Sequence, residues 1–248
     1  MPHIPILTIR NLSATFPDNN GGLRALEDIS FDVHAREFVC VLGPSGSGKT
    51  TLLRILAGLI PQTSGSFLFR DGEQPSIGMV FQQSNLMPWR TVLDNIKLPL
   101  EVINIDEQGA RLKTQEMIEL VGLQGFEDSL PRDLSGGMAQ RVAIARSLVH
   151  DPDLLLLDEP FASLDAMTRE RMWNELSRIW QARQKTVIMV THSINESLFL
   201  ADRVLVLTQR PGKVKLDLPV DLPRPRADDI RYTPHFGRLA KKLRGAIE

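Results

Sequence analysis

A glycine-rich stretch at residues 43–50 carries the first side chains that could do chemistry. It fits the pattern G-x-x-x-x-G-K-[ST] and lies between an apolar run and a helical pattern, as that motif requires. Glycines let backbone N–H groups converge on phosphates, and a helix N-terminus adds partial positive charge. We expect Lys49 to reach the β- and γ-phosphates and the Thr50 hydroxyl to ligate Mg²⁺. The predicted nucleotide-binding residues here are Gly43, Pro44, Ser45, Gly46, Ser47, Gly48, Lys49, Thr50 and Thr51.

A pair of carboxylates, Asp158 and Glu159, follows the apolar residues 154–157. Ligands of open α/β sheets bind outside the carboxyl ends of the strands, where the glycine-rich loop is also expected. We therefore expect Asp158 to hold the Mg²⁺ shell through water, and Glu159 to act as general base or polariser for the attacking water. An apolar run ending in Asp-Glu is by itself a common strand end, and the upstream phosphate loop is what favours catalysis. ATP and Mg²⁺ are the cofactors that follow.

Four apolar segments predict the strands that would position these residues, at 38–42, 154–157, 186–191 and 203–207. Helical patterns follow the first three, at 51–58, 167–183 and 195–200, and such alternation implies a largely parallel sheet. Residues 7–12 and 29–33 alternate in polarity, which suits an antiparallel flank. Between about 86 and 150 the strand signal vanishes, and 107–121 and 137–149 predict helices. A proline-containing connector at 218–226 and a final helix near 234–247 complete the expected elements.

The composition is that of one large α/β domain of 248 residues. The longest apolar runs fall far short of the ~20 residues that cross a bilayer, and the N-terminus lacks a secretory pattern. The single cysteine, Cys40, excludes an internal disulfide and fits a buried strand position, so we expect a cytosolic protein. Residues 203–248 contain 11 Lys/Arg and 5 Asp/Glu. Such a basic tail suits a membrane surface, nucleic acid or a solvated helix; the last is favoured, and without interleaved aromatics nucleic acid is not expected.

The run Leu134-Ser135-Gly136-Gly137-Met138, then Gln140-Arg141, resembles the signature sequence of ABC ATPases. Ser135 and the two glycines predict a helix N-terminus with exposed N–H groups, a second anion-binding site. The resemblance implies that this site closes on the γ-phosphate of ATP held by a second ATPase subunit, in a head-to-tail dimer. Met138 stands where the family commonly has Gln. Because the inferred contacts come from the Ser135 hydroxyl and backbone N–H groups, this departure should not abolish catalysis.

Other positions resemble further elements of that family in the expected order. Gln82 looks like the glutamine that approaches Mg²⁺ and the attacking water, and Asp165 like the dimer-coupling residue. His192 resembles the histidine that contacts the γ-phosphate, and Phe16 the ring placed against adenine. A lone histidine at a strand end is usually structural, and a lone phenylalanine usually belongs to the core. The resemblance therefore rests on all of these elements occurring together in the expected order.

The fold that the resemblance implies is α/β: a P-loop NTPase with a RecA-like core, an antiparallel β flank and an inserted α-helical subdomain at about 86–150. An ABC ATPase domain would span 1–210, and a short extension 211–248.

The stretch from Gln83 to Asn95 resembles the ATPase subunits of nitrate, sulfonate, taurine and pyrimidine-precursor importers. This implies uptake of a small solute of the nitrate, sulfonate or taurine type through a membrane permease that docks near Gln83 to Arg90. Leu86, Met87 and Trp89 would form an apolar groove wall, or else pack the helical subdomain. A periplasmic or lipid-anchored solute-binding protein would join the complex, with this chain peripheral on the cytoplasmic face of the membrane.

Three alternatives stay open at this point. An exporter or lipoprotein-release ATPase is the nearest one. A non-transport ABC ATPase acting on ribosomes or DNA would usually contain paired ATPase domains or a long coiled-coil insertion, and this chain has neither. A nucleotide sensor without hydrolysis would not need Glu159 or His192. After the last predicted core strand only about 40 residues remain, too few for the β-rich regulatory domain of sugar-type importers.

Overall fold

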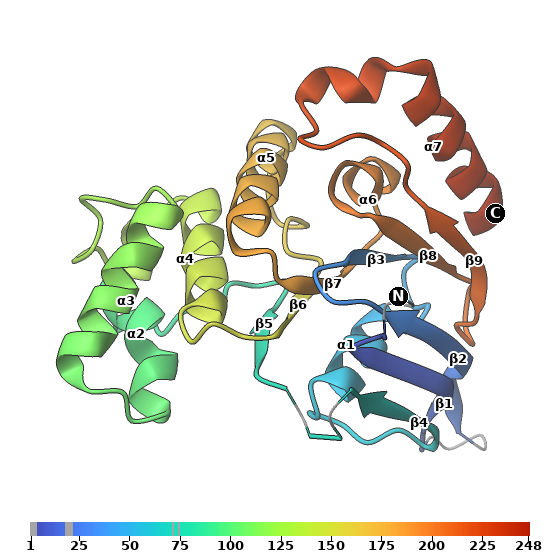
Figure 1. Cartoon of the computed structure of the whole chain (residues 1–248), viewed down its shortest axis with the longest axis horizontal. Helices are drawn as coiled ribbons and strands as arrows, with labels where there is room; N and C mark the ends of the chain where they lie inside the picture. Colours follow the sequence, from blue (N-terminus) through green and yellow to red (C-terminus); the bar gives the residue numbers. More distant parts are fainter. Residues whose placement is uncertain (1–3, 18–21, 71, 74) are drawn as a thin grey trace. The chain divides into compact units, whose positions relative to one another are not determined.

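The computed structural model describes residues 4–17, 22–70, 72–73 and 75–248. The chain divides into two compact units, which we describe separately (Figure 1). The first consists of Met1–Pro75 and Lys185–Glu248, and the second of Ser76–Gln184. The first unit is therefore built from both ends of the chain, and the second from its middle.

A sheet buried at its centre forms the core of the first unit. Strand β3 (Phe38–Leu42) lies between β7 (Thr186–Thr191) and β8 (Arg203–Leu207), parallel to both, and β9 (Val214–Pro219) pairs antiparallel with β8. Every residue of β3 and β7 is buried, which explains their continuous apolar sequences. The strands predicted at 38–42, 186–191 and 203–207 are confirmed. Strand β9 was not predicted, because it is an edge strand with half of its residues exposed, inside the expected tail.

Three helices pack on this sheet. Helix α1 (Lys49–Leu56) contacts β7, α6 (Ile194–Leu200) contacts β3, and α7 (Pro234–Ile247) contacts α6 and β8 (Figure 1). Helix α1 begins before residue 51, because the glycine-rich loop runs directly into it. It ends before residue 58, because Gly58 takes a left-handed φ of 72° that closes the last turn. The final helix is confirmed at the predicted residues.

The guanidinium of Arg226 closes the C-terminal end of α6. Arg226 is 4% exposed, and its Nη1 donates to the carbonyl oxygens of Leu198, Phe199 and Ala201 at 2.8, 3.1 and 2.7 Å. The last carbonyls of a helix have no partner within the helix, so this side chain supplies what α6 lacks. The connector that carries Arg226 is thereby fixed to the helix.

An antiparallel sheet of three strands completes the first unit. Its central strand, β1 (Leu7–Phe16), pairs with β2 (Leu23–Val33) on one side and β4 (Ser64–Phe69) on the other. The predicted flank at 7–12 and 29–33 is confirmed, with both strands longer than expected. Strand β4 was missed because most of it is exposed and it begins Ser-Gly-Ser, a turn-like sequence.

The second unit combines a parallel strand pair with a group of helices (Figure 1). Strand β5 (Ile77–Val80) pairs with β6 (Leu154–Asp158), and helices α2 (Val92–Val102), α3 (Glu107–Leu120) and α4 (Gly136–Leu148) pack on one another. Helix α5 (Ala166–Arg183) contacts α4. The helices predicted at 107–121, 137–149 and 167–183 are confirmed to within one residue at each end. Helix α2 was not predicted, since Pro99 lies inside it.

Short 3-10 helices cover Pro131–Asp133 and Asp228–Tyr232. No helix in the described part of the chain is long and apolar enough to span a membrane.

Candidate functional site

The glycine-rich loop leaves β3 at Leu42 and enters α1 at Lys49, as the sequence predicts. Gly46 and Gly48 take left-handed φ values of 81° and 87°, a conformation that is costly for residues with a Cβ. A Cβ at Gly48 would lie 2.6 Å from Leu26 Cδ2. Glycine is therefore required here both by the backbone conformation and by the close approach of β2.

The polar groups of this loop suit an anionic ligand. Lys49 is 5% exposed, and its Nζ donates to the carbonyl oxygens of Gly43 and Pro44, both at 2.9 Å. The Ser47 hydroxyl is buried and has no hydrogen-bond partner. A buried hydroxyl without a partner is costly, and a phosphate oxygen would satisfy it. The residues at 43–50 thus fit the polyphosphate of a nucleotide.

His192 emerges beside this loop at the same edge of the sheet. In the parallel pairing of β3 and β7, Leu42 is opposite Thr191, so Gly43 and His192 follow at adjacent strand ends. The His192 side chain is exposed. The Thr191 hydroxyl is hydrogen-bonded to Glu196 and accepts from the Ser193 N–H at 3.0 Å. These contacts fix the backbone on both sides of His192.

Phe16 is the last residue of β1 and is 39% exposed. An exposed ring at a strand end is available for stacking on a planar ligand. It does not have the burial of a core phenylalanine such as Phe38, which is 0% exposed.

The acidic pair and Gln82 meet in the second unit by the same geometry. Val80 is opposite Leu157 in the parallel pairing of β5 and β6, so Gln82 and Asp158 are placed near adjacent strand ends. Asp158 is 5% exposed, whereas Gln82 is exposed and Glu159 is half-buried. Glu159 has a left-handed φ of 43°, which is uncommon for a residue other than glycine. Such backbone strain gathers at functional positions.

The signature residues form the N-terminus of α4. Ser135 is the N-cap residue, and its hydroxyl accepts the Met138 N–H at 3.2 Å. Gly136 and Gly137 occupy the first turn, where backbone N–H groups have no partner within the helix. Ser135 and Gly136 are exposed, so the second anion-binding site that the sequence predicts has the geometry it needs.

Asp165 caps helix α5 and is exposed. Its carboxylate accepts the Thr168 backbone N–H at 3.0 Å, and this hydrogen bond lowers the pKa of Asp165 below its ordinary value. The residue is therefore ionised at neutral pH.

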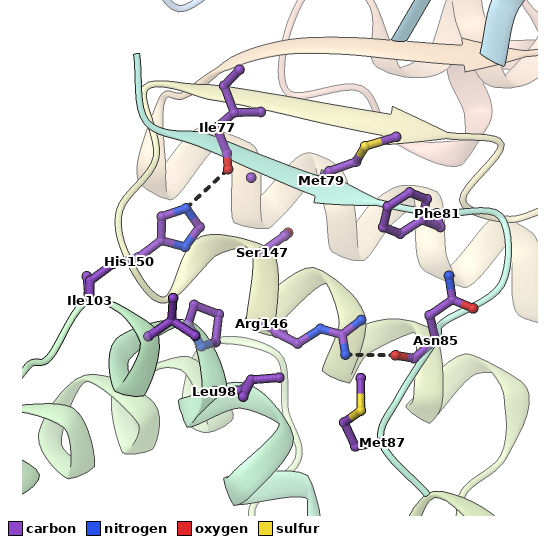
Figure 2. Close-up of a pocket in the computed structure, with 13 residues that line it drawn as sticks. Ile77, Met79, Phe81, Asn85, Met87, Leu98, Ile103, Arg146, Ser147 and His150 are labelled. Carbon is purple, nitrogen blue, oxygen red and sulfur yellow. Dashed lines mark hydrogen bonds between the residues drawn. The ribbon is translucent and has the colours of Figure 1, made fainter. Parts of the chain in front are cut away.

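An apolar pocket of about 520 Å³ opens in the second unit, next to the loop that follows Gln82 (Figure 2). It lies between β5, the loop after β5, α2 and α4. Arg146 of α4 donates to the carbonyl oxygens of Ser84 and Asn85 at 2.8 and 2.9 Å, and burial lowers its pKa. That arginine fixes the loop at the pocket's edge. The apolar side chains that line the pocket include Met79, Phe81, Met87, Leu98, Val102 and Ile103.

The three residues expected to form a groove wall lie in different environments. Met87 lines the pocket, Leu86 is half-buried, and Trp89 is 74% exposed and lies outside the pocket lining. Trp89 therefore does not pack a core. The sequence reasoning missed the contribution of α2, although Val102 and Ile103 are apolar residues at a helix end and are 71% and 54% exposed. Adjacent exposed apolar residues of this kind were the available signal.

Comparisons with known proteins agree with this geometry. The pattern of the ABC transporter family matches residues 26–162. An uncharacterized ABC transporter ATP-binding protein of Methanocaldococcus jannaschii is 51% identical over 242 residues, covering 96% of this chain and 89% of that protein. The aliphatic sulfonates import ATP-binding protein SsuB of Bacillus licheniformis is 44% identical, covering 96% of this chain and 92% of its own length. The taurine import ATP-binding protein TauB of Rhizobium johnstonii is 42% identical, with 91% and 89% covered.

A solved structure gives the same fold. A dimeric ATP-binding cassette in a post-hydrolysis state, bound to ADP and Pi, superposes with a TM-score of 0.77 at 31% identity. It covers 88% of this chain and the whole of that chain. The expected P-loop NTPase fold with an antiparallel β flank and a helical subdomain is thus confirmed. With the family pattern over more than half of the sequence and close relatives along nearly all of it, this chain belongs to the ABC transporter family, as one of its ATP-binding and ATP-hydrolysing subunits.

Proposed function

We propose that this chain powers the import of a small anionic solute of the sulfonate type, by hydrolysing ATP at the residues placed on the two strand edges. The observation that carries the proposal is the matching register in the two parallel pairs. Leu42 opposite Thr191 aligns Gly43 with His192, and Val80 opposite Leu157 aligns Gln82 with the acidic pair. The strand pair β3–β7 of the first unit carries phosphate-binding groups at its end, and the strand pair β5–β6 of the second unit carries water-activating groups.

In this mechanism the phosphate loop binds ATP through its backbone N–H groups, with the adenine against Phe16. Lys49 exchanges its two loop carbonyls for β- and γ-phosphate oxygens, since its donors are already directed into the loop. Thr50, Gln82 and Asp158 would hold Mg²⁺, with Asp158 acting through water, and the ion would supply charge neutralisation for the phosphates.

Glu159 orients and deprotonates a water that attacks the γ-phosphorus, and the bond to the β-phosphate oxygen breaks to leave ADP. His192 donates a hydrogen bond to the γ-phosphate as negative charge moves onto the leaving group. The left-handed backbone at Glu159 turns the chain at the end of β6, next to Asp158.

A second ATPase subunit completes each site. Ser135, Gly136, Gly137 and Met138 would grip the γ-phosphate of the opposite subunit, since the first turn of α4 presents N–H groups to solvent. Asp165 couples the two sites. The solved cassette that this chain resembles is dimeric, which supports a dimer; the head-to-tail arrangement is part of the proposal.

The permease would dock in the apolar pocket of the second unit. The pocket lies beside the loop after Gln82, so a helix seated there contacts the segment that also carries a water-positioning residue. This chain would then lie peripherally on the cytoplasmic face of the membrane, and a solute-binding protein would deliver solute from the other side. The names of the SsuB and TauB relatives support a sulfonate as the solute.

Hydrolysis and dimerisation are tested with two substitutions. Glu159→Gln keeps size and hydrogen bonding but loses basicity, so hydrolysis should fall by ~10²–10⁴-fold while ATP binding survives. Removing the charge next to the phosphates should let an ATP-bound dimer accumulate on size-exclusion chromatography. Adding Ser135→Arg should abolish that dimer. A stable ATP dimer that still contains Ser135→Arg would refute the sandwich arrangement.

Docking is tested by co-purifying the chain with the permease encoded beside it. Met87→Asp should weaken assembly, because it puts a charge into an apolar pocket. Leu112→Asp, at a site on α3 that is 68% exposed, is the matched control and should leave assembly unchanged. Equal assembly by both variants would place the permease elsewhere.

Import is tested in proteoliposomes of the complex, with taurine, an alkanesulfonate and nitrate as labelled solutes. Uptake of a sulfonate that depends on both ATP and a solute-binding protein is expected. ATP-driven transport without that protein would instead identify an exporter.

A further inference from the structure

A second segment of the first unit is built against the phosphate loop. The turn between β8 and β9, residues 208–213, is closed by Thr208, whose N–H donates to the Lys213 carbonyl at 3.0 Å. The Thr208 hydroxyl donates to the Pro211 carbonyl at 2.9 Å and accepts the Lys213 N–H at 3.0 Å. These hydrogen bonds give the 208–213 turn a fixed shape.

The 208–213 turn is also fixed to β2. The Gly212 N–H donates to the Ala25 carbonyl at 2.9 Å, and the Glu27 N–H donates to the Gly212 carbonyl at 3.0 Å. A Cβ at Gly212 would lie 2.1 Å from the Ser47 carbonyl oxygen, so the turn and the phosphate loop are in direct backbone contact. The turn is thereby attached to β2 on one side and packed against the phosphate loop on the other.

Arg210 extends from this turn over the phosphate loop itself. Its Nε donates to the Gly46 carbonyl at 3.2 Å, and its Nη2 would lie 3.2 Å from a Cβ at Gly46. The Ser47 N–H, on the other side of the same peptide, donates to the Pro44 carbonyl at 3.2 Å. The Gly46–Ser47 peptide is therefore held at both ends.

This peptide is the one most free to rotate without such contacts. Rotating this peptide changes ψ of Gly46 and φ of Ser47, and a glycine, with no Cβ, restricts its backbone less than any other residue. A flip would turn the Gly46 carbonyl toward bound phosphates, where an acceptor repels an anion. A hydrogen bond from a charged donor to that carbonyl opposes the flip.

We propose that Arg210 is a positioning residue for nucleotide binding, which holds the Gly46–Ser47 peptide in the orientation that receives phosphates. The inference rests on the proposed role of the 43–51 loop in binding ATP. Arg210 acts before chemistry, on the loop and not on the reacting atoms. Its loss should weaken the binding of ATP and ADP alike and raise the KM for ATP, with kcat little changed.

The test compares three variants by titration of a fluorescent ADP analogue and by steady-state hydrolysis. Arg210→Met keeps the length of the stem but loses the donors, and should raise Kd and KM by about 5–10-fold, the weight of one long hydrogen bond that is exposed to solvent. Arg210→Lys retains a donor and should recover most of the affinity. Lys213→Met, on the same turn and paired with Glu27 at 3.2 Å, removes the same charge without a contact to Gly46 and should bind as wild type.

Four results would overturn the proposal. An unchanged Kd for Arg210→Met would show that the hydrogen bond does not matter. An equal loss in Lys213→Met would show a general effect of positive charge. A fall in kcat at constant KM would place Arg210 in the chemical step. Failure of Arg210→Lys to recover affinity would show that one donor to the Gly46 carbonyl is not what matters. Lys49→Ala, measured alongside, tests whether the 43–51 loop binds nucleotide at all, and it should lose nucleotide binding altogether. If it binds as wild type, the proposed ATP site is wrong, whatever the Arg210 variants do.

Discussion

Arg226 lies where the tail meets helix α6, and replacing it by methionine removes every donor while keeping an apolar stem. Three short hydrogen bonds, to the carbonyls of Leu198, Phe199 and Ala201, are lost. The two hydrogens of Nη1 are shared by these three carbonyls, so at ~1.5–3 kcal/mol for a hydrogen bond to a charged group they account for ~3–6 kcal/mol. Two longer hydrogen bonds from Nη2, at 3.4 and 3.3 Å to the Val220 and Leu222 carbonyls, add ~1 kcal/mol each, which brings the total to roughly 5–8 kcal/mol.

The charge that methionine removes offsets part of that loss. Burial lowers the pKa of Arg226 from its ordinary value to about 10. At ~1.36 kcal/mol per pKa unit, holding the guanidinium charged in this site costs about 3 kcal/mol, which the substitution returns. The Arg226 Nε is also buried without a partner, which adds to the offset. We expect a net destabilisation of ~2–5 kcal/mol.

Urea denaturation followed by far-UV circular dichroism measures this change in the free energy of unfolding. Arg244→Met is the matched control, because Arg244 is exposed on α7 and its loss should change stability by less than ~0.5 kcal/mol. If Arg226→Met costs under ~1 kcal/mol, the arginine is not what closes α6, and the reasoning from its carbonyl contacts fails.

Three further predictions concern single positions. Gly48→Ala should weaken ATP binding about 5–30-fold in calorimetry, because a left-handed residue with a Cβ costs ~1–2 kcal/mol and Leu26 leaves no space for it. Gly78→Ala should lower the free energy of unfolding of the second unit by ~1–3 kcal/mol in urea denaturation, because its Cβ would lie 2.2 Å from the Ser147 carbonyl oxygen. Wild-type stability would contradict this close contact between the two backbones. Asp165→Asn should lower stability slightly at neutral pH, because a lowered pKa stabilises only the ionised form. The difference should shrink as the pH falls below the ordinary pKa of 3.8 and vanish below the lowered pKa of the folded protein; a difference that persists in stronger acid would exclude this cause.

The parts of the fold that sequence reasoning predicted well are those with a strong local pattern. Strands β3 and β7 are buried along their whole length, so their apolar runs mark their ends to the residue. Strand β4 is mostly exposed and half of the β9 residues are exposed, so neither strand has a continuous apolar run. Helix α2 was missed because Pro99 interrupts its helical sequence, although the Thr91 side chain caps its first turn.

In the candidate site too, residues in short motifs were predicted and contacts between distant parts of the chain were not. Motif residues such as Lys49 and Asp158 were predicted because short spacings fix their chemistry. The contacts of Arg210 and Arg226 were not, since their partners lie 164 and 25–28 residues away along the chain. No local pattern distinguishes a basic residue that holds a backbone carbonyl from one in solvent. The pocket lining was missed for the same reason, because it gathers residues from a strand, a loop and two helices.

The order in which the ribosome releases the chain has a consequence for the phosphate loop. Strand β3 emerges early, but both of its partners, β7 and β8, belong to residues after 185. At ~5–20 residues per second, the ~150 residues between Leu42 and its partner Thr191 take roughly 7–30 s to synthesise. During that interval the second unit, a continuous segment, can fold. Strand β3, the most apolar strand of the first unit, has both edges unpaired during that time. It is therefore the segment of the nascent chain that most needs protection from aggregation.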